Sequence, residues 1–318
     1  MAKKKTDFVV PELPPVPDIV NPHDHSGNWL WRHFDDYQDS YRNRDDLEPP
    51  PVPNTEVVTA ENPLAVHVAD SIRSPYSYLV VPRLAYLQSQ YNCTVEMHVV
   101  FPLAIRDPSF FGQPENPKEG HGFAEQPKTG GRWYKIDDII WDCPRVAQYQ
   151  GMPFRFAHPD PIAQKKWPHT DPDYMRIAPI EKQPYITWMV RLANAAELAG
   201  KSLEFLLYTG PLVWGDKSEF WPADIPEAIG KCGMDYDATI KDIQENPAKY
   251  DAVWQANQKL QMDSGHGGVP CMIFNGEPFF GQDRFDHLFW RLRLNGLTKR
   301  EAAISPLVTK PIRWPDGL

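Results

Sequence analysis

The chain has 318 residues, of which 42% are hydrophobic and 34 are proline, and its formal net charge is −9. This length is enough for a sizeable core and predicts roughly two domains. The negative charge argues against nucleic acid or an anionic membrane surface as the main partner. The amino terminus carries lysines but no long apolar segment, so it does not have the pattern of a signal peptide. No stretch reaches the roughly 18 apolar residues of a membrane span. We therefore expect a protein whose main partner is neither nucleic acid nor membrane.

The cysteines are widely separated and form no C-x-x-C pair. They are Cys93, Cys143, Cys232 and Cys271. Without such a pair the chain lacks both the zinc-knuckle pattern and the dithiol redox pattern. We interpret each cysteine as a small buried apolar residue, and this usage fits a reducing cytoplasm. His23 and His25 lack further ligands at a suitable spacing, so no metal site is expected.

Residues 1–60 are predicted to form an irregular N-terminal extension. Proline clusters at residues 11–22 and 49–53 and blocks regular structure there. One short helix is predicted within 29–41, because apolar residues recur in this segment at helical spacing. We expect the extension to lie on the main body or on a neighbouring subunit.

A β-α-β unit begins near residue 64. The apolar runs 65–69 and 94–102 predict two strands, and a serine followed by proline begins a helix over 75–90. Ser74 therefore caps the helix and places one hydroxyl at its positive end, where an anion such as a thiolate from a bound partner can also be held. Pro82 lies inside this helix and is expected to kink it or end it early.

The rest of the chain alternates between loop, helix and strand signals. A long loop is predicted over 103–134, and helices over 185–198, 201–214 and 251–262. Strands are predicted over 271–274 and 278–280, with an Asn-Gly turn between them, and a last helix over 283–294. The fold class is thus α/β. A thioredoxin-like domain, residues 61–102 and 266–296, is interrupted by an all-helical insertion domain, residues 135–265, and followed by a tail, residues 297–318.

Three motifs, in this order, resemble the signatures of the kappa-class glutathione transferases and the 2-hydroxychromene-2-carboxylate isomerases. They are Ser74-Pro75-Tyr76-Ser77-Tyr78-Leu79, Gly268-Val269-Pro270 and Phe280-Gly281-Gln282-Asp283-Arg284. A fourth, weaker match is Lys135, Asp142, Arg145 and Ala147. The resemblance covers about 65–102 and 135–296, and it implies a cis Pro270 that faces the amino end of the first helix.

The resemblance implies glutathione as the cofactor. Ser74 takes the place of the family's catalytic serine, whose hydroxyl donates to the glutathione sulfur. Val269, before Pro270, would pair its backbone with the cysteinyl part. Gln282 and Asp283 would open the last helix, where backbone N–H groups meet the γ-glutamyl carboxylate and Asp283 accepts the ammonium. A simple helix cap is an equally good interpretation of Asp283.

Further contacts also rest on the resemblance. Lys135 matches the family's lysine near the glycyl carboxylate, and Asn116 is a candidate for its glutathione-contacting asparagine. The family usually has an aspartate three residues before the serine, where this chain has Ser71, with Asp70 one position away. Candidate substrate contacts are aromatic and basic residues of the long loop: Arg106, Phe110, Phe111, His121, Phe123, Arg132 and Trp133.

These features predict a glutathione-dependent isomerase of an aromatic or conjugated, carboxylate-bearing small molecule, acting as a cytoplasmic homodimer. The thiolate would add reversibly to an electron-poor carbon. One alternative is a kappa-class-like glutathione transferase or peroxidase, and a second is a non-catalytic thioredoxin-fold binding protein. A disulfide oxidoreductase is disfavoured, because Ser74 and Ser77 occupy both positions of the usual dithiol.

Overall fold

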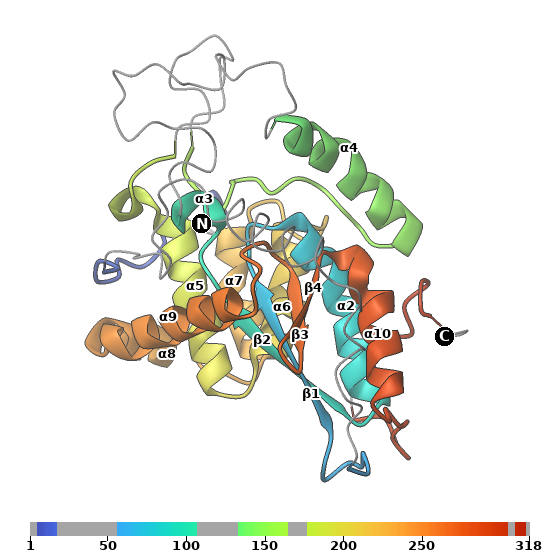
Figure 1. Ribbon diagram of the computed structural model, residues 1–318. Helices are drawn as coiled ribbons and strands as arrows, with labels where there is room; N and C mark the ends of the chain where they lie inside the picture. Colours follow the sequence, from blue (N-terminus) through green and yellow to red (C-terminus); the bar gives the residue numbers. More distant parts are fainter. Residues whose placement is uncertain (1–4, 18–55, 107–132, 165–176, 305–308, 316–318) are drawn as a thin grey trace, which may run out of the picture.

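A four-stranded sheet forms the centre of the computed structural model, which describes residues 5–17, 56–106, 133–164, 177–304 and 309–315. The strands are β1 (Leu64–Asp70), β2 (Cys93–Val99), β3 (Cys271–Phe274) and β4 (Glu277–Phe280), in the spatial order β2-β1-β3-β4. β1 and β2 are parallel and joined by α2 (Pro75–Gln90), whereas β3 is antiparallel to both β1 and β4. α10 (Phe285–Leu294) lies beside α2, and α5, α8 and α9 lie across the sheet from them (Figure 1).

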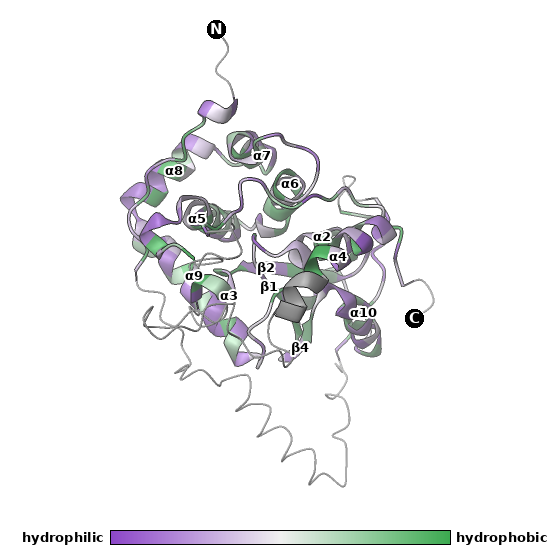
Figure 2. Cartoon of the chain, turned by 90° about the horizontal axis from the view of Figure 1, so that it is seen from above, coloured by the Kyte–Doolittle hydropathy of each residue, from purple (hydrophilic) through white to green (hydrophobic). Residues whose placement is uncertain are grey.

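Between β2 and β3, the regular elements of the described residues are helices. They are α3 (Leu103–Arg106), α4 (Trp133–Gln150), α5 (Pro184–Leu198), α6 (Ser202–Val213), α7 (Ile225–Lys231), α8 (Tyr236–Glu245) and α9 (Pro247–Asp263), with short 3-10 turns at η5 (Ile180–Lys182) and η6 (Trp221–Asp224). α2 and α6 lie near the middle of the molecule (Figure 2), and the apolar side of α2 belongs to the core. None of the described helices combines the length and apolar character needed to cross a bilayer. This arrangement confirms the predicted thioredoxin-like sheet with a helical insertion.

The two faces of the sheet carry different layers of the core. Val66, Val68 and Met272 are fully buried and belong to the large apolar cluster that also contains the apolar side of α2. On the other face Ala69, Cys271 and Ile273 form a small cluster against Leu260 of α9. Because side chains alternate across a strand, neighbouring residues of β1 contribute to different layers.

Several predicted boundaries differ from the structure. The strand expected over 94–102 ends at Val99, which pairs with Asp70, the last residue of β1; beyond this point β1 offers no further partner, and Pro102 has no N–H for a ladder. The helix expected over 283–294 begins as a 3-10 turn, η7 (Gln282–Arg284), before α10.

The expectation that Pro82 ends its helix early is wrong. α2 continues to Gln90, because its buried side chains hold it in place against the sheet and the other helices.

The described part of the N-terminal extension lies on the helical domain. The ring of Phe8 lies 5.8 Å from that of Trp188 in α5, measured between centroids. The Arg191 guanidinium donates to the carbonyls of Pro14 and Pro15. Residues 5–17 therefore pack on the main body, as one of the two alternatives predicted. The helix expected within 29–41, and His23 and His25, lie outside the described residues.

Candidate active site

Ser74 is the N-cap of α2, as predicted. Its backbone is extended, its Oγ accepts a hydrogen bond from the Ser77 N–H at 3.2 Å, and Pro75 follows at the first helical position. The same Ser74 hydroxyl lies 3.5 Å from the Val269 carbonyl oxygen, to which it donates. The half-buried Ser74 side chain thus joins the start of α2 to the loop that precedes β3.

The peptide bond between Val269 and Pro270 is cis, which confirms the prediction. The Pro270 carbonyl accepts from the Gly281 N–H at 2.8 Å. This bond fixes the cis proline beside the turn that starts η7. The motif at the cis proline thus contacts the Gly281 motif directly. It also contacts the Ser74 motif, through the bond between the Ser74 hydroxyl and the Val269 carbonyl, so the structure brings all three motifs together.

Two side chains from helices between β2 and β3 hold the loop before the cis proline. Arg106 of α3 donates to the Gly267 carbonyl at 3.1 Å, and Gln261 of α9 donates to the Gly268 carbonyl at 2.7 Å. A Cβ at Gly268 would lie 2.4 Å from the Phe280 ring, so only glycine lets this backbone approach the ring. The expectation that Arg106 binds a substrate carboxylate is wrong: this side chain is buried and supports the loop.

Gln282 and Asp283 lie at the start of η7 but have different surroundings. Gln282 is buried, and its side-chain oxygen accepts from Arg83 at 2.6 Å and from Gln150 at 3.0 Å. The Asp283 carboxylate is 60% exposed and pairs with Arg284 at 2.7 Å. The first N–H groups of a helix lack intrahelical acceptors. Hence η7 offers backbone donors and an accessible carboxylate, whereas the Gln282 side chain is a packing element.

Arg83 is the buried cation beneath this turn, and the sequence did not indicate it. It donates to the Gln282 carbonyl at 2.5 Å, and its guanidinium lies 4.9 Å from the centroid of the Phe285 ring. Burial lowers the pKa of Arg83 to about 10, while the nearby carboxylates of Asp286 and Asp283 act in the opposite direction. Arg83 remains protonated at neutral pH and anchors η7 to α2.

The fourth motif is only partly visible. Lys135 lies in α4, but its side chain is outside the described part of the chain, as are Asn116 and the remaining loop candidates. Asp142 of the same helix accepts a hydrogen bond from the Tyr76 hydroxyl at 2.7 Å. Burial and this bond raise the pKa of Tyr76, so its hydroxyl keeps its proton. The contact connects α4 to the serine motif on α2.

A recess of about 280 Å³, part of it open to solvent, lies beside Ser74. Asp70, Ser71 and Ser77 line it from the β1–α2 side, and Thr209, Gly210 and Trp214 line it from α6 and its end. The sequence motifs did not indicate the α6 wall. A Cβ at Gly210 would lie 3.0 Å from the Tyr78 ring, so the glycine allows α6 to approach α2 closely.

Asp70 is the most unusual group in this recess. Its side chain is 1% exposed, and its Oδ2 has no hydrogen-bond partner among the described residues. Burial raises the pKa of Asp70 to about 7, although a hydrogen bond with Ser77 lowers it. A carboxyl group beside Ser74 therefore titrates near neutral pH and not in the usual acidic range. The position at the end of β1, before a serine-proline cap, was the signal that could have indicated it.

The cysteines take no part in this site as nucleophiles. All four are buried and free, as predicted. Burial raises the pKa of each thiol to about 12, including that of Cys271, which directly follows Pro270. Any thiolate at the start of α2 must therefore come from a bound molecule.

Comparison with known proteins identifies one family. A family model described as the DSBA-like thioredoxin domain matches residues 66–293. No curated protein matches the chain. Similar solved structures include a 2-hydroxychromene-2-carboxylate isomerase, with 18% identity, 72% of this chain and 95% of that chain covered, and a TM-score of 0.49. A probable DsbA oxidoreductase from Streptomyces coelicolor has 15% identity, 72% and 90% coverage and a TM-score of 0.45. The cytosolic disulfide reductase DsbM from Pseudomonas aeruginosa has 16% identity, 73% and 100% coverage and a TM-score of 0.40.

Proposed function

This chain belongs to the DSBA-like thioredoxin domain family, and from that premise we propose that it binds glutathione and uses it to isomerise an aromatic or conjugated small molecule. One observation carries the proposal. The Ser74 hydroxyl, at the start of α2, lies 3.5 Å from the carbonyl that precedes a cis proline. No cysteine stands at either dithiol position of this motif.

The surroundings fit a peptide-like thiol. The half-buried Val269 presents its backbone beside Ser74, and a backbone edge of this kind pairs with an extended peptide as an added strand does. Asp283 offers an exposed carboxylate for an ammonium group, and the first N–H groups of η7 suit a carboxylate. The Gly281 carbonyl and N–H keep these parts together, through bonds to Arg284 and Pro270.

Bound glutathione would supply a thiol whose thiolate adds reversibly to an electron-poor carbon of the substrate. Ser74 would turn its hydroxyl from the Val269 carbonyl, a bond at the upper limit of hydrogen-bond length, and donate to the sulfur. The positive end of α2 favours the same negative charge. The protonated form of Asp70 adds no opposing charge to the recess. The serine thus stabilises the thiolate and forms no covalent bond itself.

The fate of glutathione in the reaction distinguishes an isomerase from a transferase and from a non-catalytic binding protein. An isomerase returns glutathione unchanged, whereas a kappa-class-like transferase forms a stable conjugate that consumes it. Disulfide exchange needs a thiol at the cap, and this chain has Ser74 and Ser77 there, with its cysteines buried elsewhere. A non-catalytic binding protein would turn over neither kind of substrate.

Glutathione should bind to the wild-type chain, and Asp283→Ala should weaken the binding by roughly 10- to 100-fold. This range corresponds to the loss of a hydrogen bond between charged groups, about 1.5–3 kcal/mol. Isothermal titration calorimetry measures both affinities. Asp237→Ala is the matched control, because Asp237 is also an exposed carboxylate in the first turn of a helix, α8. An absence of binding to the wild type would refute the cofactor assignment, and an unchanged Asp283→Ala affinity would refute this role of Asp283.

Ser74→Ala should keep the glutathione affinity within about 3-fold but raise the pKa of the bound thiol by roughly 1–2 units. The variant loses the donor to the sulfur while the Val269 backbone and η7 remain. Ultraviolet difference absorbance of the thiolate, followed as a function of pH, measures the shift. Ser202→Ala is the control, because Ser202 lies in the first turn of α6 and accepts from the Met97 N–H, away from this site. A thiol pKa that is equal in Ser74→Ala and wild type would contradict the role of Ser74.

A further inference from the structure

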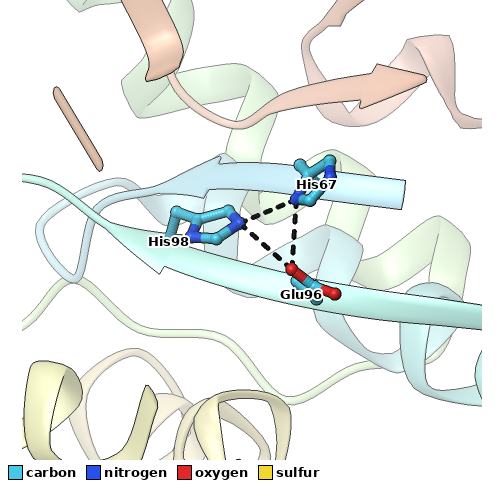
Figure 3. Close-up of side chains that lie close together, drawn as sticks. All are labelled: His67, Glu96 and His98. Atoms are coloured by element: carbon cyan, nitrogen blue, oxygen red, sulfur yellow. Dashed lines mark hydrogen bonds and ion pairs between the residues drawn. The ribbon is translucent and has the colours of Figure 1, made fainter. Parts of the chain in front are cut away.

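A second group of polar side chains lies on the sheet itself. It consists of His67 from β1 and of Glu96 and His98 from β2, which point toward one another (Figure 3). The strand register pairs His67 with Glu96 and Ala69 with His98, so the three side chains share one face of the two parallel strands. None of them lines the recess beside Ser74.

Three potential ligand atoms face one another in this cluster. His67 Nδ1 lies 3.0 Å from His98 Nε2 and 3.2 Å from Glu96 Oε2, and His98 Nε2 lies 3.9 Å from Glu96 Oε2. The ligand atoms of a tetrahedral zinc site, with bonds of about 2.0–2.1 Å, lie roughly 3.3 Å from one another. The three separations are close to this value. A triangle of this size leaves room at its centre for an ion roughly 2 Å from each atom.

The other nitrogen of His98 provides an independent indication. His98 Nδ1 lies 2.8 Å from Glu197 Oε1 of α5 and 3.2 Å from Asn257 Oδ1 of α9. Asn257 in turn donates to the second oxygen of Glu197 at 2.7 Å. A carboxylate at this distance favours the tautomer with the proton on Nδ1, which leaves the Nε2 lone pair directed at the cluster. Metal-binding histidines are held in this way by a carboxylate behind the ring.

Within the cluster, hydrogen bonding offers one proton to two acceptors, and the 54% exposed Glu96 carboxylate must share it or bond solvent. With the His98 proton directed at Glu197, a proton on His67 Nδ1 must serve both His98 Nε2 and Glu96 Oε2, which lie at similar distances from it. A cation at the centre would use a lone pair of each atom. The two helices that supply Glu197 and Asn257 hold His98 in place, so the strands need not move to form the site.

We propose that His67, Glu96 and His98 bind a divalent transition-metal ion, with Zn²⁺ as the best match. Two imidazole nitrogens with one carboxylate oxygen suit Zn²⁺ better than Ca²⁺ or Mg²⁺, which prefer all-oxygen sites. The side chains of His67 and Glu96 are 37% and 54% exposed, so the fourth position is open to water or to an incoming ligand. The site stands apart from the proposed glutathione site and does not depend on it.

The test uses the full chain after treatment with a chelator and dialysis, titrated with ZnCl₂ in a calorimeter. We expect saturable binding that His67→Gln and Glu96→Gln abolish or weaken more than 100-fold. Glu197→Gln keeps all three ligands and should weaken binding about 10- to 100-fold, as loss of an outer carboxylate partner does. His287→Gln, at an exposed position on α10, is the control and should bind Zn²⁺ as the wild type does.

Cobalt gives a readout that does not depend on affinity alone. Co²⁺ added to the wild type should produce the strong visible absorption of a low-coordinate site, which His67→Gln loses and His287→Gln retains. Circular dichroism of each variant checks that the fold is kept. Zn²⁺ binding that is equal in wild type and His67→Gln, or a wild type that binds no Zn²⁺, would overturn the proposal.

Discussion

Asp251→Ala should lower the free energy of unfolding by about 3–5 kcal/mol, because it leaves a buried cation without its partner. Arg191 of α5 is fully buried, and its guanidinium bonds both carboxylate oxygens of Asp251 of α9 at 3.0–3.1 Å. Trp254 also donates to this carboxylate at 3.0 Å. The pair therefore joins two helices of the insertion, and through Arg191 it also holds the N-terminal segment.

Urea denaturation of Asp251→Ala and of a matched variant on the same helix measures this effect. Asp263→Ala removes an ion pair with Lys259 whose side chains are 57% and 69% exposed, so its cost should stay below about 1 kcal/mol. Replacing both buried partners, as Arg191→Met with Asp251→Leu, should recover part of the loss, because no charge then remains buried. Equal losses for Asp251→Ala and Asp263→Ala would show that the buried pair does not stabilise the insertion.

The elements that local pattern specifies were predictable from the sequence. β1, α2, α5 and the β3–β4 hairpin have the expected type and nearly the expected bounds, since each is encoded by apolar periodicity and by a cap or turn close in sequence. Element boundaries that depend on contacts with distant parts of the chain were not predictable from the sequence. β2 ends early because its partner strand β1 ends at Asp70, opposite Val99.

The features of the candidate site also fall into two groups: those that the sequence indicates and those that depend on tertiary contacts. Ser74 as a cap follows from a short motif, the cis Pro270 follows from the family resemblance, and both are present. The burial of Asp70, the support of Gln282 by Arg83 and the wall from α6 come from contacts between segments far apart in the chain. A sequence pattern reports which side chains are available, but packing decides which of them are desolvated.

The histidine cluster shows the same limit for metal ligands. His67 lies about 30 positions before Glu96 and His98, so no ligand spacing of the usual kind is visible. Along β2, Glu96 and His98 alternate with buried residues, a pattern typical of a solvent-facing strand side. Only the parallel register with β1 brings His67 to the same point. The sequence therefore contains no indication that these three side chains lie close together, and no metal site was expected there.

Asp70→Asn should stabilise the protein at alkaline pH and have little effect at acidic pH. The Asp70 carboxyl group has a pKa of about 7 in the folded chain, against an ordinary value of 3.8, because burial disfavours the charged form. As the pH rises from about 4 to about 7, the unfolded chain loses this proton while the folded chain keeps it. The stability that the protonated group contributes is therefore present at low pH and lost through this window.

The expected difference can be given an order of magnitude. Each unit of pKa shift corresponds to about 1.4 kcal/mol, so the advantage of Asp70→Asn should grow from near zero at pH 4 to on the order of 3–4 kcal/mol at pH 8. Asparagine keeps the size and hydrogen-bonding capacity of the protonated carboxyl group. Urea denaturation of both proteins at a series of pH values gives the two curves.

A control variant makes this test specific to Asp70, and the result bears on the function of the recess. Asp237→Asn alters an exposed carboxylate and should give a curve parallel to that of the wild type. A constant difference between Asp70→Asn and wild type across pH 4–8 would show that Asp70 does not titrate in this range. If the difference does grow, the wild-type chain keeps a destabilising acid beside Ser74 at neutral pH. A cost of this kind is typical of a functional site, because selection for folding alone would favour the asparagine.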